Sequence, residues 1–398
     1  MATQTDDAAE WDVVVPAGEE SYFVRFGSFL LCVSHNDSDL AEVARKIEQA
    51  LHQDSRVAEV YPFENRVEWT DTDVHYPHRR LASAGDLLSG RVHLHTVEFS
   101  EAIRFKVSVP IKNQPARGGY KDITSDSYWA AWDGTTLAVM WPASLDGPFP
   151  MAGGHIVIDL LQDVVEAAGY SLYTQACSPG CEHRFAHRNV LVVCNAEEMG
   201  EEEMHELGDQ DVVIERVEGG QPKEHLLLDL ERLFFSQAAY FARYKNYARH
   251  IRDLEDLARG YVDELLTLNY QRIQDANLRL WRRVWNLWHK RKERRRGVEL
   301  IAILWLLLAR LEAVRRDWFA DRRKLGESTS GAGNEVLFDL DKSDDDDAVT
   351  SQDFTFIRSA IQQSATRFDT RTMALATAAG GIAGFVGAIL GAVLASGG

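Results

Sequence analysis

The chain is poor in cysteine, with four in 398 residues. Thiols this few and this scattered exclude the disulfide framework of a small secreted domain. The first dozen residues, MATQTDDAAEWD, also lack an apolar run, which excludes a secretory signal there. We therefore expect the bulk of the chain to lie in the cytoplasm.

Positive charge is scarce overall, with 43 Lys and Arg against 61 Asp and Glu and a net charge of −18. Because nucleic-acid binding requires a basic surface, we expect no nucleic-acid partner. The stretch from Lys223 to Lys324 is the exception, since 23 Lys and Arg stand there against 14 Asp and Glu. A basic segment in an acidic protein indicates a specific acidic partner, such as anionic lipid or another protein.

The common catalytic motifs are missing as well. The chain has no Gly-rich phosphate loop ending in Lys-Ser/Thr, no G-x-S-x-G elbow and no H-E-x-x-H helix. We therefore predict a non-enzymatic protein without catalytic residues or a cofactor. The alternative is an enzyme or metal-binding protein that uses the stretch CSPGCEHRFAH. Its Cys177, Cys181, His183 and His187 suit zinc in type and in pair spacing, although the two pairs are closer together than in a zinc finger.

The first 220 residues alternate strand-like and helix-like patterns. Residues 22–35 read as extended chain, 37–51 as an amphipathic helix, and 128–141 as a hairpin turning at Asp133-Gly134. A second helix is expected over 153–170. Strands in hairpins with inserted helices predict an α+β domain, with a split, ferredoxin-like arrangement as one option.

Proline is absent, and glycine nearly so, from the seventy residues after His225. Apolar residues recur there every three to four positions, which predicts two or three long helices with Gly260 as a break. The apolar stretch 301–309 is too short to cross a bilayer and is expected to be covered on every side in a helical bundle or by subunit contacts.

Three tryptophans, Trp281, Trp285 and Trp288, share one face of this helical region. Basic residues that include Arg294, Arg295 and Arg296 follow them. Interfacial helices combine aromatic and basic side chains in this way, so these six residues are candidates for contact with anionic lipid. The alternative is that the tryptophans pack in a helical bundle and the arginines are simply solvated.

An acidic, Gly/Ser-containing segment comes next and is expected to form a flexible linker. Within it, aspartates are candidate sites for an activating protease: Asp341, Asp344, Asp345, Asp346 and Asp347. The alternative is a solvated spacer. A short helix is expected over 354–368.

The chain ends in a segment without charge, the 23 residues 373–395. A helix of about 20 residues crosses a hydrocarbon core of about 30 Å, so one transmembrane helix is predicted. Arg367 and Arg371 precede it and would keep the preceding domains on the cytoplasmic side. The alternatives are a buried hairpin or a peripheral anchor.

Small residues dominate this segment. One series at four-residue spacing consists of Ala376, Gly380, Gly384, Ala388 and Ala392, and Gly387 and Gly391 form a second pair. Small residues every fourth position let helices in a membrane approach closely, and two such faces allow assembly into rings. The sequence therefore predicts homo-oligomerisation through this segment.

The fold class that follows is an α+β N-terminal domain, then a long-helix (all-α) domain and one C-terminal transmembrane helix. The predicted segments are a sensing or binding domain at 1–222, a basic helical domain at 223–325, the linker at 326–352, an amphipathic pre-membrane helix at 353–371 and the transmembrane helix at 372–396.

This order resembles the membrane-permeabilising effectors of bacterial abortive-infection (antiviral) defence systems, in which a soluble sensing domain controls a short pore-forming segment. The resemblance covers the domain order and the Gly-rich tail. The order also resembles CorA-type cation channels, but the Gly-Met-Asn signature of that family is absent.

The resemblance to the effectors implies a pore-forming protein that oligomerises in the inner membrane when triggered, either by proteolysis in the linker or by a sensor protein. Before activation the chain would be either soluble or already anchored. The alternative is a tail-anchored scaffold or ligand-binding protein whose span is only a tether.

Overall fold

The computed structural model describes residues 21–33, 40–63, 66–75, 91–114, 125–142, 154–175, 185, 189–196, 203–207, 210–218, 221–276, 287–329 and 339–365. These residues belong to two compact units. The first comprises Met1–Val74, His93–Asn246 and Asp321–Asp344, and the second comprises His75–Val92, Tyr247–Ala320 and Asp345–Gly398. The predicted order of a sheet domain followed by a helical region is confirmed.

Within the described ranges, the sheet domain contains one mixed sheet of eleven strands. The strands are β1 (Ser21–Cys32), β2 (Val57–Val60), β3 (Val67–His75), β4 (Arg91–Phe99), β5 (Ile103–Ser108), β6 (Ser127–Trp132), β7 (Thr136–Pro142), β8 (Ser171–Gln175), β9 (Asn189–Ala196), β10 (Glu203–Leu207) and β11 (Gln210–Glu218). The main path runs β10-β11-β9-β1-β7-β6-β5-β2, with β3, β4 and β8 attached beside it. This sheet is larger than the ferredoxin-like arrangement offered as an option. Among the pairings described, only that of β9 with β11 is parallel.

Strand β1 is the centre of the sheet. It pairs antiparallel with β7 and β9 through its first half, and with β8 and β4 through its second half. Its side chains alternate between two faces, as the period of two in a strand requires. Both faces are buried, because Phe23 and Phe29 lie on one face and Phe26 lies on the other, each at most 1% exposed.

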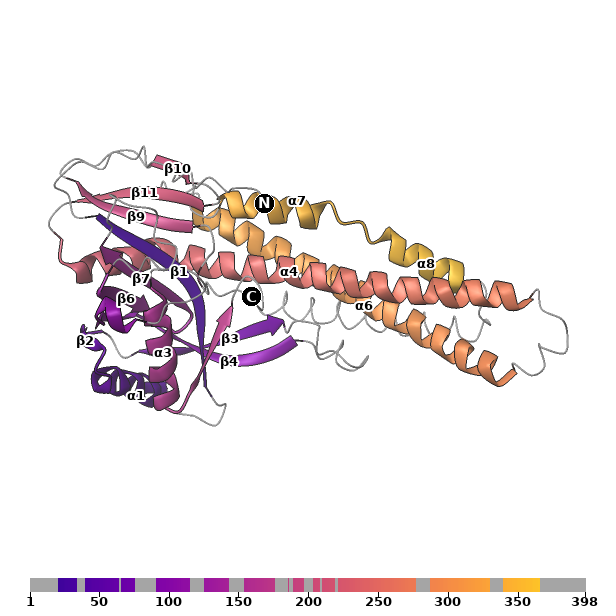
Figure 1. Ribbon diagram of the computed structural model, residues 1–398, viewed down its shortest axis with the longest axis horizontal. Helices are drawn as coiled ribbons and strands as arrows, with labels where there is room; N and C mark the ends of the chain where they lie inside the picture. Colours follow the sequence, from indigo (N-terminus) through magenta and orange to yellow (C-terminus); the bar gives the residue numbers. More distant parts are fainter. Residues whose placement is uncertain are drawn as a thin grey trace, which may run out of the picture. The chain divides into compact units, whose positions relative to one another are not determined.

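Helices α1 (Leu40–Gln53) and α3 (His155–Ala167) lie side by side and cover one face of the sheet (Figure 1). Both helices were expected from the sequence. Their apolar residues join the large core, and Trp132 within this core donates its indole N–H to the Phe29 carbonyl at 2.9 Å. Burying such side chains contributes about 1.5–3 kcal/mol each.

The opposite face of the sheet is covered by the beginning of α4 (Lys223–Ala276). Phe234 of α4 packs on Phe26 with ring centroids 5.5 Å apart, and Lys223 lies 4.3 Å from the Tyr22 ring centroid. Glu231 of the same helix accepts a hydrogen bond from the Ala102 N–H at 2.9 Å. The first turns of α4 are thus part of the sheet domain.

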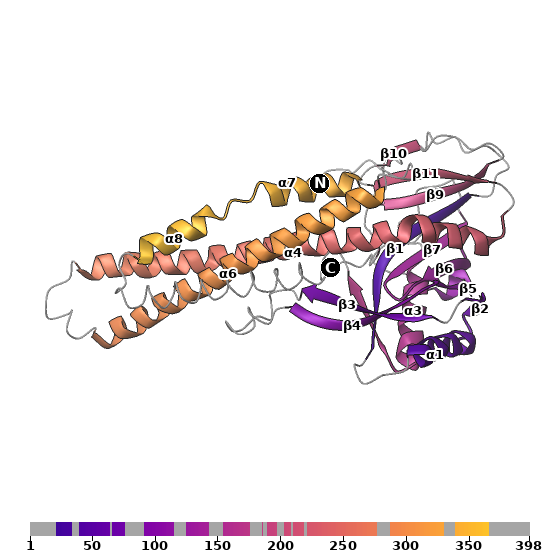
Figure 2. The ribbon, with the colours of Figure 1, turned by 180° about the vertical axis from the view of Figure 1, so that it is seen from behind.

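The helical region consists of the rest of α4 with α6 (Leu287–Thr329), α7 (Asp339–Thr350) and α8 (Thr355–Ala365). The short 3₁₀ helix η2 (Ile111–Asn113) belongs to the sheet domain. Helices α4 and α6 run alongside each other (Figure 2), joined by Arg296 and Glu264 at 2.7 Å. Helix α8 was predicted, and its Ser364 accepts a hydrogen bond from Asn269 of α4 at 2.8 Å.

The predicted break at Gly260 is wrong, because α4 continues through it as one helix of 54 residues. Gly260 is exposed, and an added Cβ would meet nothing within 4 Å. A single Gly costs a helix only about 1 kcal/mol. The buried apolar residues on both sides, Leu254, Ala258, Val262 and Leu265, offset this cost.

The apolar stretch 301–309 lies within α6 as expected of a core helix. Its buried residues are Ile301, Ile303, Leu304, Leu307 and Leu308. Trp305 and Leu306 are only half-buried, so the described residues do not cover this helix on every side. None of the helices in the described ranges is both long enough and apolar enough to cross a bilayer.

The acidic stretch differs from the flexible linker that the sequence predicts, since residues 339–350 form α7. Asp345 is 2% exposed, and its Oδ1 accepts a hydrogen bond from the Arg252 guanidinium at 2.8 Å. Val349 is fully buried. Tyr244 donates its hydroxyl to the Lys342 carbonyl at 2.8 Å. Acidic residues are also favourable near a helix N-terminus. The aspartates proposed for cleavage therefore lie in a helix, and a protease would need α7 to unfold first.

Replacing Arg252 with leucine is expected to loosen α7. Asp345 would lose its 2.8 Å ion pair while its carboxylate stays buried, which costs about 1–3 kcal/mol. Limited proteolysis with an Asp-directed protease should then cut at 344–347 several times faster than in the native chain. Arg323→Leu removes the same charge from an exposed site on α6 and serves as the control. Equal cleavage of both variants would show that Arg252 does not hold α7 in place.

Candidate ligand-binding site

Most residues proposed from the sequence for metal binding or membrane entry lie outside the described residues. These are Cys177, Cys181, His183 and His187, and the small-residue series from Ala376 to Ala392. Within the described ranges, no three His, Cys, Asp or Glu side chains are grouped closely enough to hold a metal ion. The zinc and membrane hypotheses therefore stay predictions.

The candidate lipid-contacting residues are distributed differently. Trp281 and Trp285 lie outside the described ranges, whereas Trp288 and Arg294 belong to α6. Arg295 is exposed, as lipid contact requires. Arg296 is paired with Glu264 and also lies 3.2 Å from Glu299, and the hydrogen bond from Glu264 raises the pKa of this guanidinium further above its usual range. Arg296 thus has an intramolecular partner, a role that the sequence did not indicate.

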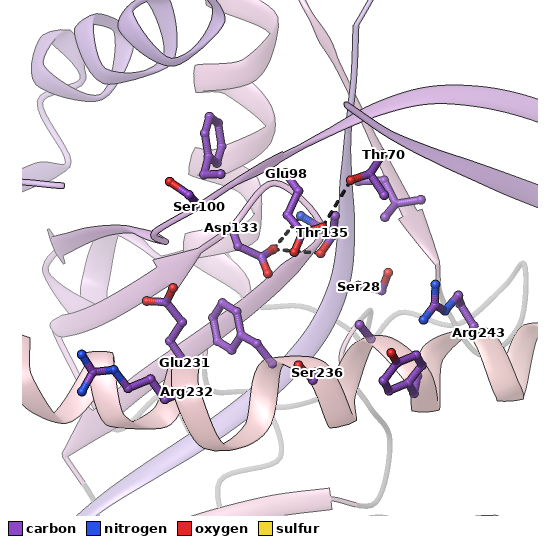
Figure 3. Close-up of a pocket in the computed structure, with 15 residues that line it drawn as sticks. Ser28, Thr70, Glu98, Ser100, Asp133, Thr135, Glu231, Arg232, Ser236 and Arg243 are labelled. Carbon is purple, nitrogen blue, oxygen red and sulfur yellow. Dashed lines mark hydrogen bonds between the residues drawn. The ribbon is translucent and has the colours of Figure 1, made fainter. Parts of the chain in front are cut away.

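A pocket of about 450 Å³ lies in the first unit between the sheet and the beginning of α4. Its size falls in the range of small-molecule sites, about 300–1,000 Å³. Strands β1, β3 and β4 and the turn between β6 and β7 form one wall, and α4 forms the other (Figure 3). It is lined by Ser28, Leu30, Thr70, Glu98, Phe99, Ser100, Asp133, Thr135, Glu231, Arg232, Phe235, Ser236, Ala239, Tyr240 and Arg243.

Asp133 is placed by the tight turn between β6 and β7, which the sequence predicted from Asp133-Gly134. Its Oδ1 accepts hydrogen bonds from the backbone N–H groups of Thr135 and Thr136, at 2.7 and 2.6 Å, and from the Thr135 hydroxyl at 2.9 Å. Its other oxygen points toward the cavity in Figure 3. The side chain is 7% exposed, and burial raises its pKa to about 7 despite these hydrogen bonds.

Gly134 makes this turn possible. Its φ of +89° is a conformation that residues with a Cβ rarely adopt. A Cβ there would collide with the carbonyl oxygen of Val97 on β4. The turn is further held by hydrogen bonds from the Leu31 N–H to the Gly134 carbonyl, at 2.7 Å, and from the Phe99 N–H to the Asp133 carbonyl, at 2.7 Å. The Asp133 carboxylate is therefore rigidly positioned.

Glu231 reaches into the pocket from α4 on the opposite wall (Figure 3). Its Oε1 accepts the Ala102 N–H, whereas its Oε2 is buried and has no hydrogen-bond partner among the described residues. Burial raises the pKa of this carboxyl. An uncompensated carboxylate oxygen in a cavity costs free energy, so a ligand that donates to it would be favoured.

The other charged residues of the pocket are arranged around this pair. The Thr70 hydroxyl donates to Glu98 at 3.2 Å. Arg243 stacks over the Tyr240 ring, 4.7 Å from its centroid, and lies 4.0 Å from Asp321. Arg232 is exposed. The result is a cavity with carboxylates on both walls and hydroxyl groups between them.

The sequence indicated only one part of this site. The Asp-Gly pair signalled a turn, but no motif linked it to Glu231, which lies far along the chain in a segment recognised only as helical. The sequence did contain one signal for Glu231. This residue lies on the face of α4 that carries the buried Leu227, Leu230 and Phe234. A charged residue beside an apolar stripe is often paired or functional. Comparison of the chain with protein-family models, curated proteins and solved structures found no match.

Proposed function

We propose that this protein is a non-enzymatic membrane effector. Its first unit holds a small ligand, its helices and C-terminal segment oligomerise, and that segment enters and permeabilises the inner membrane when triggered. The observation that carries the proposal is that α4, which forms one wall of the pocket, continues without a break to Ala276 in the second unit. A ligand that contacts residues 231–243 therefore acts on an element that both units share.

The sequence of the C-terminal segment supports the membrane step. It is uncharged from 373 to 395 and has small residues at four-residue spacing. Such spacing favours close packing of helices in a bilayer. Arg295 on α6 offers an exposed positive charge for anionic lipid. A second function, a tail-anchored ligand-binding protein, is favoured by the pocket alone, because a pocket does not require a pore.

Dye release from anionic liposomes distinguishes these two functions. The full chain is expected to release dye, and the double variant Gly380→Leu/Gly384→Leu is expected to release it on the order of tenfold more slowly, because leucine blocks close helix contact. The matched control is Thr377→Leu/Gly381→Leu, one position along the same segment, where Phe385 and Ile389 continue the face with large residues. The control should release dye at the native rate.

A chain that ends at Asp369 gives the baseline without the segment. Full-chain release equal to this baseline, with the protein still bound to vesicles, would make the segment a tether and support the second function. Equal release by both double variants would contradict assembly through the Gly380 series.

A further inference from the structure

We infer that the pocket between the sheet and α4 binds a small organic cation, a protonated amine, between Asp133 and Glu231. The inference deepens the proposed function, since this amine would be the ligand that the first unit holds. Its test measures binding without a membrane, so its outcome does not depend on permeabilisation.

The carboxylates supply the first reason. Asp133 is more than nine-tenths buried, and its three hydrogen bonds all go to Oδ1. Its Oδ2 points into the cavity (Figure 3). From the other wall, Glu231 contributes a buried Oε2 that has no hydrogen-bond partner in the described part of the chain. Two carboxyl groups that line one cavity, one of them with an unpartnered buried oxygen, favour a donor. An ammonium group offers three N–H donors with a positive charge.

Of the neighbouring arginines, Arg104 and Arg243 are engaged by other groups, and Arg232 is exposed. Arg104, the basic residue that most lowers the pKa of Glu231, is held by Glu101 at 2.5 Å and by the Pro62 carbonyl at 3.0 Å, outside the pocket lining. Arg243 is engaged with Tyr240 and Asp321 at the other end of the pocket. An anionic ligand is disfavoured, because it would meet Glu98, Asp133 and Glu231.

The remaining lining favours an organic amine over a metal ion. No group of three metal-binding side chains occurs among the described residues, and the cavity of about 450 Å³ is far larger than a bare cation. Hydroxyl groups and aromatic side chains complete it, namely Ser100, Thr135, Ser236, Phe99, Phe235 and Tyr240. Aromatic faces attract organic cations, and hydroxyl groups bind the polar atoms of a carbon chain.

Isothermal titration calorimetry on the full chain at pH 8 tests the inference, with putrescine and spermidine as probes. We expect at least one amine to bind with a defined stoichiometry. The neutral analogue butanediol and magnesium chloride should not bind. Glu231→Gln should weaken amine binding on the order of tenfold, because it removes the charge that faces the ammonium group.

The matched control is Glu166→Gln on the exposed surface of α3, on the other face of the sheet. Both substitutions remove one negative charge, so an effect of net charge alone would weaken binding equally in both. Equal weakening, binding of butanediol as tight as that of putrescine, or binding of magnesium alone would each overturn the inference. So would the failure of both amines to bind.

The failures of the two proposals are distinguishable. If the amines bind and the liposomes never leak, the pocket is assigned and the pore is not. If dye release depends on the Gly380 series but neither amine binds, the effector stands and its ligand is of another class.

Discussion

Replacing Gly134 with alanine is expected to unfold the first unit or to lower its melting temperature severely. The residue has φ +89°, and an added Cβ would collide with the Val97 carbonyl oxygen, a backbone atom fixed in β4. A left-handed conformation costs a residue with a Cβ about 1–2 kcal/mol, and overpacking adds about 1–3 kcal/mol. Because total stability is only about 5–15 kcal/mol, the sum removes a large part of it.

Gly169→Ala is the control for this expectation. Gly169 has nearly the same φ, +86°, but an added Cβ would meet nothing within 4 Å. It should therefore cost only the conformational part, about 1–2 kcal/mol. Thermal unfolding followed by circular dichroism compares the two variants. Equal losses would show that the approach of Val97 does not matter, and that the turn can shift to accommodate a methyl group.

Replacing Asp133 with asparagine is expected to stabilise the protein at pH 8 and to leave its stability nearly unchanged near pH 4. Burial and, to a lesser extent, Glu98 raise the pKa of Asp133 from 3.8 to about 7. The folded state therefore keeps this proton up to about pH 7, whereas the unfolded state loses it near pH 4. Between these values the folded state binds more protons, so stability falls as pH rises, and the full penalty is present above pH 7.

Asparagine avoids this penalty because it stays neutral while its Oδ1 can still accept the hydrogen bonds from Thr135 and Thr136. The expected gain at pH 8 is roughly 2–4 kcal/mol. Other charged groups facing the site, namely Glu98 on β4 and Glu231, Arg232 and Arg243 on α4, are unchanged. Melting temperatures of both chains across pH 4–8 measure the effect.

Asp54→Asn is expected to change stability in the opposite direction. The hydrogen bond from Arg56 lowers the pKa of Asp54, so its contribution is present above the unfolded pKa and is lost as pH falls through the lower, folded value. This variant should be less stable than the native chain at pH 8.

A stability difference between Asp133→Asn and the native chain that does not change with pH would contradict the prediction for Asp133. It would mean that the Asp133 carboxyl group of the folded protein is already ionised at pH 4.

A gain in stability at Asp133 would also explain the site in energetic terms. Residues that bind ligands are often worse for stability than their neutral replacements, because they keep a charge where the fold alone does not need one. Asp133→Asn should therefore be more stable and should bind amines less tightly. This pairing separates a functional carboxylate from one that only holds a turn.

Local patterns in the sequence predicted the elements whose signal is short-range. The β6–β7 hairpin follows from Asp133-Gly134 between apolar arms, and α3 follows from its apolar repeat. Strands β3, β10 and β11 were missed, because their many charged residues obscure the alternation of strands. Their places are set by pairing with distant strands, which no local pattern records.

The helical region illustrates the opposite limit. Gly260 and the acidic run of α7 both have weak helix propensity, and both are helical, because tertiary contacts override propensity. The pocket was beyond prediction for a related reason. Asp133 and Glu231 meet only after the sheet has formed and α4 has packed on it.

The position of β1 has a consequence for how the protein is made. This strand is complete at Cys32, yet its partner β9 extends to Ala196. At about 5–20 residues per second, synthesis of that interval lasts roughly 10–30 s. During this time the other partners of β1 are completed one after another, β4 at Phe99, β7 at Pro142 and β8 at Gln175. The sheet around β1 is therefore completed late on the ribosome. Its folding depends on contacts between residues distant in sequence, a topology that folds slowly.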